Sequence, residues 1–491
     1  MDTSREKPPA GDIVARLLEL QQGAAPLQLD SQTRRAALAK VAEFTESFIE
    51  RSAKQAVYQP APAAADSLAA LRITGQPDTI ESALDILHEH VSSTGQAIVS
   101  DRFFAYIPSG GIYPSALADF IAAVINRYAG VGYAGPGAAR LEQSLVNWLV
   151  DLTGYPETAE GDLTSGGSMA TLSAVVTARE AHGIGSAKVS RSVVYLTPQM
   201  HHTFAKALRI AGMGDCVLRQ VPMTGELRMN VAELEHAIAA DRDAGLTPWL
   251  VATSAGSTDV GAVDPLDDIA DVARAAGVWF HVDAAYGGAF LLCKDGKTRL
   301  AGLEKSDSLV LDPHKGFFLP SGTGAVLVRD GQKMRNAFRA RGVYMQDIED
   351  DTERSACDLS PELTRPFRGL RFWLPLKLLG VAPFRAALEE KLLLARYFRD
   401  CMRDEEHCEL GPGPDLSVVT FRYLPSGHDP DAFNRRLVKE IQDDARVFLT
   451  STTIDGRYTI RMAILGFNTH LESVDTAIAV IREKVALLLS R

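Results

Sequence analysis

Two short apolar runs in the middle of the chain each lead into charged side chains. Residues 278–282 are followed by Asp283, and residues 308–311 are followed by the sequence Asp-Pro-His-Lys, which ends at Lys315. Strand ends of an α/β protein deliver such side chains to one ligand at the same edge of a sheet. A lysine in a partly apolar pocket can form a Schiff base with an aldehyde, and an aspartate beside a pyridine nitrogen keeps that nitrogen protonated. The pair predicts pyridoxal 5'-phosphate (PLP) as cofactor, with Lys315 on its aldehyde and Asp283 on its ring nitrogen.

Each of these two assignments has a structural alternative. Lys315 could be an ordinary surface lysine after a strand, and Asp283 could cap a helix or form a structural salt bridge. Other lysines lie nearby in the sequence, namely Lys294, Lys297 and Lys305. Those three fall in a polar loop and no strand presents them, so Lys315 is the stronger candidate.

Three further segments predict the rest of the cofactor site. A Gly-Gly-Ser turn precedes a helical period, and backbone N–H groups at helix starts bind phosphate, which selects Gly167 and Ser168. His201 follows a strand-like run, from which it could stack on the cofactor ring and take part in proton transfer. Thr258 and Ala285 would contact the cofactor from the same edge, the alanine with its methyl group against one ring face. The alternatives are an ordinary helix cap for the Gly-Gly-Ser turn, a capping or core role for His201, and a turn role for Thr258.

The elements that must position these residues alternate between short β-branched runs and helical periods. The runs expected as strands are 192–196, 216–221, 249–253, 278–282 and 308–311. Such alternation predicts right-handed βαβ units and a mainly parallel central sheet covered by helices. We therefore expect an α/β fold whose large, cofactor-binding domain spans residues 95–380.

The two ends of the chain predict smaller units. Residues 1–94 indicate an arm of amphipathic helices, interrupted by the prolines of segment 60–63, which packs on a partner chain. Residues 381–491 indicate a small α+β domain. The expected elements are a long helix over 370–387 that leads into this domain, antiparallel strands over 416–422 and 458–464, and a final helix over 471–489.

Composition narrows the class of protein. The chain has 491 residues, 46% of them hydrophobic, and a formal net charge of −11, which argues against a nucleic-acid surface and favours small-molecule partners. The five cysteines are scattered without metal-ligand spacing, so we expect no metal site and reduced thiols in the cytoplasm. The charged first residues resemble neither a signal peptide nor an anchor, and no apolar run is long enough to cross a membrane, so we expect a soluble protein.

With these residues in hand, the chain resembles the group II PLP-dependent amino acid decarboxylases, the family of aromatic-amino-acid, histidine and glutamate decarboxylases. The matching segments are 103–108, Gly-Ser at 167–168, His201, Thr258, His-Val-Asp-Ala-Ala-Tyr at 281–286, Pro-His-Lys at 313–315, and Phe-Arg-Gly-Leu-Arg-Phe-Trp at 367–373. The resemblance implies a fold-type I, aspartate aminotransferase-like architecture and a homodimer with its site at the subunit interface. It adds His314 to the cofactor-binding residues.

The same resemblance implies the reaction and part of the substrate pocket. The expected reaction is decarboxylation of an L-amino acid to an amine and carbon dioxide. The substrate-lining segment of the family corresponds to Tyr106, Ile107, Pro108 and Ser109, which would suit an aromatic or apolar side chain. Arg368 and Arg461 could contact an acidic substrate, although arginines at such positions are more often in structural ion pairs.

One departure from the family pattern bears on the product. Family decarboxylases carry a tyrosine on a loop before the Phe-Arg-Gly-Leu segment, and this phenol protonates Cα after carbon dioxide has left. The corresponding residues 345–360 contain no tyrosine: Ala356 stands near the expected position, and Tyr344 precedes the loop. Without that acid, reaction with dioxygen could give an aldehyde, ammonia and peroxide instead of the amine, as in the related aldehyde synthases. His201 remains as another proton donor.

Two further alternatives stay open. Related sites cleave other bonds at Cα, so a carbon–sulfur or carbon–carbon lyase is one of them. The other is a dimer that binds the cofactor without catalysing a reaction. This is the weakest of the hypotheses, because a protein without catalysis has no reason to keep Lys315, Asp283 and His201 together.

Overall fold

The computed structural model describes residues 10–52, 55–60, 75–340 and 354–490. The chain divides into two compact units, residues 1–97 and 98–491, each of which is described by itself. The domain boundaries expected after residues 94 and 380 stay predictions. In the described part of the chain, no helix combines the length and the apolarity needed to cross a bilayer.

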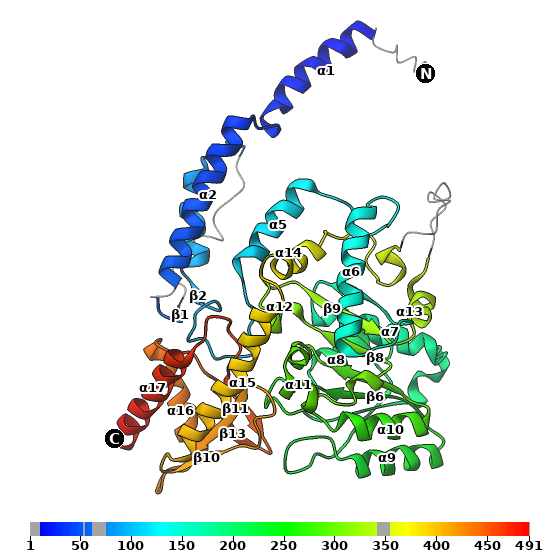
Figure 1. Ribbon diagram of the computed structural model, residues 1–491, viewed down its shortest axis with the longest axis vertical. Coiled ribbons are helices and arrows are strands. Elements are labelled where there is room, and N and C mark those ends of the chain that lie inside the picture. The colour runs from blue at the N-terminus through cyan, green and yellow to red at the C-terminus, as the bar shows by residue number, and fades with distance from the viewer. Residues whose placement is uncertain (1–9, 53–54, 61–74, 341–353, 491) are drawn as a thin grey trace, which may run out of the picture. The chain divides into compact units, whose positions relative to one another are not determined.

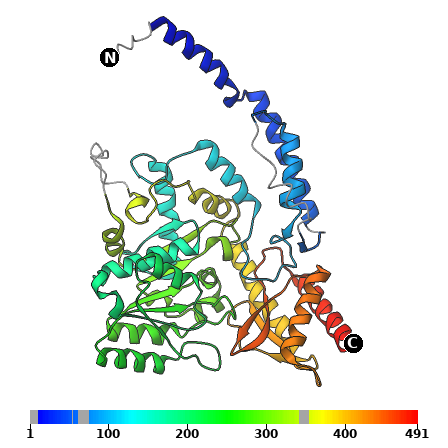
Figure 2. The ribbon, with the colours of Figure 1, turned by 180° about the vertical axis from the view of Figure 1, so that it is seen from behind.

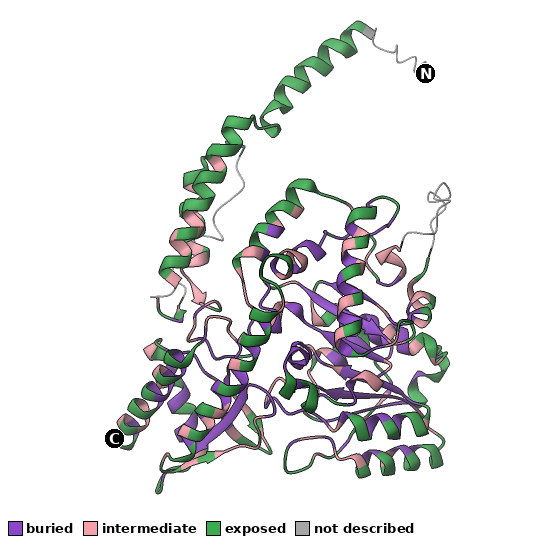
Figure 3. Cartoon of the chain, viewed as in Figure 1, coloured by how far each residue is buried: buried purple, intermediate pink, exposed green. Residues whose placement is uncertain are grey.

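The first unit is helical, as the sequence predicts. Its elements are α1 (Ala10–Ala24), α2 (Ser31–Ser52), α4 (Ile80–Leu87), a π-helical turn (His88–Ser92), and the antiparallel two-residue strands β1 (Tyr58–Gln59) and β2 (Gly95–Gln96). Most side chains of these helices are exposed (Figure 3), including Ile13, Val14, Leu17 and Leu18 on α1. Apart from Pro60, the proline segment at 60–63 lies outside the described residues.

A seven-stranded sheet forms the centre of the second unit (Figures 1 and 2). Its order is β3-β9-β8-β7-β6-β4-β5, and the strands are β3 (Glu160–Thr164), β4 (Ser192–Leu196), β5 (Val217–Gln220), β6 (Thr247–Ser254), β7 (Trp279–Asp283), β8 (Ser308–Leu311) and β9 (Gly324–Val328). Neighbours from β8 to β5 are parallel, and only β9 runs antiparallel to its two partners. All five predicted strands and the mainly parallel sheet are confirmed; β3 and β9 were not predicted.

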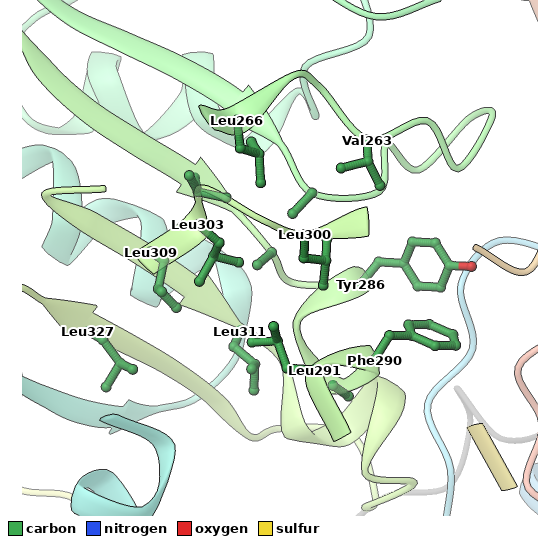
Figure 4. Packing of buried hydrophobic residues seen from close by; sticks show 14 of the residues in the cluster. Val263, Leu266, Tyr286, Phe290, Leu291, Leu300, Leu303, Leu309, Leu311 and Leu327 are labelled. Carbon is green, nitrogen blue, oxygen red and sulfur yellow. The ribbon is translucent and has the colours of Figure 1, made fainter. Parts of the chain in front are cut away.

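Helices cover both faces of this sheet because its central strands are buried and apolar on both faces. Successive residues of β4 face opposite ways: Val193 and Tyr195 join one core cluster, and Val194 and Leu196 join the other. The first cluster includes α6 (Pro136–Thr153), α9 (Val231–Asp243) and α10 (Leu266–Ala276); the second includes α7 (Gly167–Ala181), α8 (Thr203–Ile210) and α13 (Gly331–Phe338). Figure 4 shows part of the first cluster, in which leucines of β8 and β9 pack with those of the segment 291–303.

The C-terminal part contains a second sheet, which is antiparallel throughout. Its order is β10 (Cys408–Leu410), β11 (Val418–Tyr423), β13 (Arg457–Ala463) and β12 (Thr450–Ile454), packed with α16 (Pro430–Asp444) and α17 (Leu471–Leu489). The two strands and the final helix expected here are confirmed. The single helix expected over 370–387 is wrong: α14 (Gly369–Leu379) ends and α15 (Ala382–Arg403) begins anew. Gly380 adopts φ 70°, which breaks the helix, and Pro383 falls in the first turn of α15.

A buried arginine holds the edge strand β3, which leads into the Gly-Gly-Ser turn. The Arg365 side chain is fully buried and donates to Asp162 Oδ1 (2.5 Å), Glu142 Oε2 (2.8 Å) and the Leu163 carbonyl (2.7 Å). Burial raises the pKa of Glu142, and the nearby Arg365 charge opposes that shift. The arginine therefore compensates two carboxylates that have little access to water.

Replacing Arg365 by methionine is expected to destabilise the protein by about 3–5 kcal/mol, because two buried carboxylates then lose their partner. Urea unfolding followed by circular dichroism measures this change. Arg403→Met is the matched control, since its ion pair with Asp400 is exposed on both sides and should contribute less than about 1 kcal/mol. An equal loss of unfolding free energy in the two variants would contradict the stabilising role assigned to Arg365.

Candidate active site

A cavity of about 300 Å³ lies at the edge of the central sheet where β3, β4, β6, β7 and β8 end. This is the edge at which α/β sheets bind ligands. The cavity wall contains eight of the residues predicted from the sequence: Gly167, Ser168, His201, Thr258, Asp283, Ala285, His314 and Lys315. The fold thus brings together side chains and turns that are up to 148 positions apart in the chain (from residue 167 to residue 315).

Lys315 is presented by a short helical turn, α12 (Pro313–Gly316), directly after β8. Its Nζ lies 2.9 Å from Asp312 Oδ2, and the Asp312 side chain is only 3% exposed. The surface alternative for this lysine is therefore wrong, because the amine is inside the cavity wall and ion-paired there. Asp312 was not assigned a role from the sequence, although its position at the end of a buried strand is the same signal that identified Asp283.

Asp283 is the last residue of β7, which pairs with β8 in the sheet, and it lines the same cavity as Lys315. Its Oδ1 accepts a hydrogen bond from the Ala285 backbone N–H (3.1 Å), which fixes the carboxylate at the strand end. The described structure gives this carboxylate no ion pair with a protein cation within 4 Å. A negative charge that is oriented and unneutralised in a cavity is suited to a cationic group of a ligand.

The turn before α7 is built to bring backbone N–H groups close to a ligand. Gly166 precedes the helix at φ 141°, a conformation that favours glycine, and no side chain caps the helix start. Ser168 therefore does not act as the helix cap. A Cβ at Gly167 would stand 2.8 Å from Asp312 Oδ2, so only glycine fits here without displacement. The first N–H groups of a helix lack intrahelical acceptors and attract anions.

His201 faces the cavity and at the same time contacts the start of α8. Its Nδ1 is 2.7 Å from Thr203 Oγ1, and its ring centroid is 4.3 Å from that of His202. The capping alternative and the cavity role are thus both present in one residue. Burial lowers the pKa of His201 below its ordinary value of 6.5, an effect that Asp283 opposes. The imidazole is therefore mainly neutral at pH 7.

The conserved domain of pyridoxal-dependent decarboxylases matches residues 62–424. The chain belongs to this family. It is 34% identical to an aromatic-L-amino-acid decarboxylase of Bacillus atrophaeus over 80% of this chain and 82% of that protein. It is 29% identical to a phenylacetaldehyde synthase of Petunia hybrida, covering 84% of this chain and 86% of that protein. The crystal structure of Oryza sativa TDC with PLP and tryptamine superposes with a TM-score of 0.89 at 26% identity, covering 94% and 99% of the two chains.

The residues in the wall of this cavity have the chemistry that PLP requires. Two buried polar atoms of the wall, Asp312 Oδ1 and Ser257 Oγ, have no hydrogen-bond partner among the described residues, so the wall is polar and incompletely satisfied there. An amine, an oriented carboxylate and a glycine turn at a helix start supply the three kinds of contact that an aldehyde, a pyridine nitrogen and a phosphate need. The protein is a PLP-dependent amino acid decarboxylase of fold-type I, as the sequence predicts.

The four residues expected to line the substrate pocket do not line the cavity of the single chain. Tyr106 has φ 52°, its side chain is half exposed, and its carbonyl accepts a hydrogen bond from Arg461 Nη2 (2.8 Å). Ile107 packs against the main core, Pro108 is buried, and Ser109 Oγ accepts from Ser321 Oγ (2.8 Å). Their contact with substrate stays a prediction.

The two arginines weighed as substrate ligands have structural partners. Arg461 is buried and also donates to the Thr258 carbonyl (2.6 Å), which ties the C-terminal sheet to the loop after β6. Arg368 forms a two-pronged pair with Glu362, both distances being 2.7 Å. Neither arginine lines the cavity: Arg368 forms the structural ion pair expected as the alternative, whereas Arg461 is held by hydrogen bonds to backbone carbonyl groups.

The segment in which the family tyrosine is missing is described only in part. Residues 341–353, including Tyr344, lie outside the described residues. Ala356 begins a short 3-10 helix (Ala356–Asp358), where the Cys357 N–H donates to the Gly130 carbonyl.

Proposed function

We propose that this decarboxylase acts on an L-amino acid with an aromatic or apolar side chain and releases the amine and carbon dioxide. The observation that carries the proposal is the convergence of Lys315 and Asp283 on one cavity of a chain whose relatives include aromatic amino acid decarboxylases. Bound PLP supplies a conjugated cationic ring that accepts the electron pair of the bond that breaks.

The residues of the cavity have separate roles in holding the cofactor and in moving a proton. Lys315 would hold the aldehyde carbon covalently; its Nζ lies 2.9 Å from Asp312 Oδ2, which keeps the amine in the cavity wall. Asp283 would oppose the positive charge at the ring nitrogen, and the backbone at Gly167 and Ser168 would donate to the phosphate. His201 would restrain one ring face and deliver a proton to the carbon that loses the carboxylate.

Incubating the PLP-saturated protein with each of the common L-amino acids tests the proposal. We expect carbon dioxide release with aromatic or apolar substrates, and mass spectrometry identifies the organic product. Absence of carbon dioxide and of any spectral change with every amino acid would remove the proposal. Release of another fragment from Cα would instead establish a different lyase.

A second candidate function is decarboxylation coupled to oxidation. It is favoured by the absence of a tyrosine from residues 345–360 and by the phenylacetaldehyde synthases among the relatives. The balanced reaction converts the amino acid, dioxygen and water into the aldehyde, carbon dioxide, ammonia and hydrogen peroxide. An oxygen electrode separates the two functions, because simple decarboxylation consumes no dioxygen.

The balance between amine and aldehyde is expected to depend on pH through His201. Because its pKa lies below 6.5, the imidazolium that protonates carbon is populated only as the pH falls below that value. The charged groups that act on it are Asp283, His202, Lys315 and Asp259. We expect the amine fraction to rise as the pH is lowered from about 8 to about 5.

Product ratios measured by mass spectrometry over this pH range check the expectation. His201→Asn should remove the pH dependence and leave the aldehyde fraction high throughout. An identical pH profile in the variant would show that another group supplies the proton.

The protein is further proposed to act as a homodimer in the cytoplasm. Helix α5 (Tyr113–Ile125) exposes an apolar face with Leu117, Phe120, Ile121 and Val124, of which Val124 is 68% exposed. A contiguous apolar face of this kind is typical of a protein–protein interface. The five cysteines are all free, which supports a reducing compartment.

Phe120→Glu combined with Val124→Glu is expected to shift the protein from dimer to monomer and to lower activity at least about tenfold, because charges then enter the apolar contact. Sedimentation velocity measures the change. Leu393→Glu on α15 places one such charge at a comparably exposed leucine elsewhere and should leave the mass unchanged. A parent protein that sediments as a monomer would overturn the proposal.

A further inference from the structure

A second cavity, of about 380 Å³, lies at the opposite edge of the central sheet. There β7 and β8 begin, β9 ends, and α10 turns into β7. Its wall consists of His182, Ala270, Ala273, Arg274, Gly277, Val278, Trp279, Phe280, Lys305, Asp307, Arg329 and Lys333. Trp279 begins the same strand that ends at Asp283, and four steps along a strand span about 13 Å. The two cavities are therefore distinct.

The wall of this second cavity is strongly basic. It carries the four cations Arg274, Lys305, Arg329 and Lys333, and the single carboxylate is Asp307. The whole chain has a formal charge of −11, so the positive charge of this cavity wall is opposite in sign to the net charge of the protein. Clustered charges of one sign inside a concave wall concentrate the potential and raise the local concentration of counter-ions.

Two of the cations, Lys333 and Arg329, have uncharged partners that do not neutralise their positive charge. The Lys333 ammonium lies 5.3 Å from the centroid of the Trp279 ring, and the described residues include no carboxylate within 4 Å of it. Arg329 Nη1 donates to the Glu304 carbonyl, a neutral acceptor. A guanidinium has five N–H donors, so several remain for a ligand.

The other two cations form only exposed ion pairs. Lys305 Nζ is 2.5 Å from Asp267 and 3.9 Å from Asp271, and Arg274 Nη1 is 3.1 Å from Asp271. Both carboxylates are more than half exposed, and such pairs are weak enough to exchange with another anion.

The remaining polar groups counter this charge only in part, because the wall has one carboxylate for four cations. The Asp307 carboxylate accepts a hydrogen bond from the Phe280 N–H (2.8 Å); burial raises its pKa, and the nearby Lys333, His182 and Arg329 oppose that shift. Burial also lowers the pKa of His182, whose ring packs edge-on against Trp249 and Trp279. A neutral imidazole can still donate one hydrogen bond to a ligand oxygen.

We propose that this cavity binds a small anion with several charged oxygens, either a phosphoryl compound or a polycarboxylate. Lysine and arginine on separate elements, α10, α13 and the segments beside β8 and β9, surround the space from different sides. Planar guanidinium groups and an ammonium are the groups that bind such oxyanions. The site is independent of the cofactor cavity, in which a glycine turn rather than side-chain cations meets the phosphate.

Isothermal titration of the PLP-saturated protein with sodium pyrophosphate and, separately, with citrate tests the site, in a phosphate-free buffer of low ionic strength. We expect saturable binding of at least one anion, with one site per chain, and binding should weaken as salt is added. The anion that binds more tightly distinguishes a phosphoryl from a polycarboxylate ligand. Absence of saturable binding of both anions at millimolar concentration would overturn the proposal.

Charge-reversal variants locate the binding site. Lys333→Glu and, separately, Arg274→Glu should each weaken binding at least about tenfold, the equivalent of about 1.4 kcal/mol. Lys297→Glu changes the net charge equally at an exposed position outside the cavity wall and should bind as the parent does. Unchanged thermal melting and turnover show that each variant is folded. Equal weakening in all three variants, or none in the two cavity variants, would contradict the site.

Discussion

Lys315→Ala is expected to lower kcat by at least about a thousandfold, because the cofactor loses its covalent attachment and the amine leaves the reaction site. In the parent protein this amine lies in the cavity wall, 2.9 Å from Asp312. Steady-state carbon dioxide release at saturating PLP measures the loss. Borohydride reduction followed by peptide mapping should place the pyridoxyl group on position 315 of the parent and nowhere in the variant.

Lys297→Ala provides the matched control for this prediction. Lys297 lies in the neighbouring exposed segment of the chain and does not line the cavity. The control should keep full turnover and a pyridoxyl group on Lys315. Activity that survives in Lys315→Ala, or a label on any other lysine of the parent, would show that the covalent assignment is wrong.

Asp283→Asn is expected to lower kcat by about 10²–10³-fold while the cofactor remains bound. The amide has the shape of the carboxylate and can still accept from the Ala285 N–H, so the strand end should keep its geometry. What is lost is the negative charge that we propose would keep the ring nitrogen protonated and able to withdraw electrons. The effect should therefore appear in kcat more than in KM.

Measured cofactor content separates loss of chemistry from loss of binding in this variant. Asp268→Asn on the exposed side of α10 removes the same charge elsewhere and should leave kcat unchanged. A variant that binds PLP normally and turns over at the parental rate would show that another group protonates the ring nitrogen.

The predicted strands were found because they are local features. Four of the five runs, 192–196, 249–253, 278–282 and 308–311, are buried on both faces, as strands covered by helices on both sides must be, and a polar residue follows each of them; β5 at the edge of the sheet alternates between partly buried and exposed residues. Parallel strands place their carboxyl ends at one edge, so residues after separate strands could be assigned to one cavity before their distances were known. The same logic could have included Asp312.

Of the two strands that were missed, β3 lacks this local pattern. β3 contains Glu160, Gly161 and Asp162 within five residues, and its charged side chains are stabilised by arginines from distant segments, such as Arg365. β9 is buried along its whole length, with alternate side chains in the two core clusters, so its sequence carries the same signal as the predicted strands and could have been found. Its antiparallel direction, by contrast, is defined only by pairing in the sheet. Likewise the break at Gly380 depends on a left-handed backbone conformation inside an otherwise apolar helical pattern.

Residue types and their order along the chain were sufficient to predict the cofactor, an α/β fold and seven residues of one cavity, because strand periodicity, strand ends and helix starts are encoded over a few neighbouring positions. The family resemblance added His314 and the fold-type I architecture. Partnerships between distant residues required the folded chain. The ion pair of Lys315 with Asp312, the anchoring of Tyr106 and Thr258 by Arg461, and the basic cavity beside Trp279 all join side chains whose distances depend on how the elements pack. Packing is a cooperative property of the whole core, and no short stretch of sequence contains it.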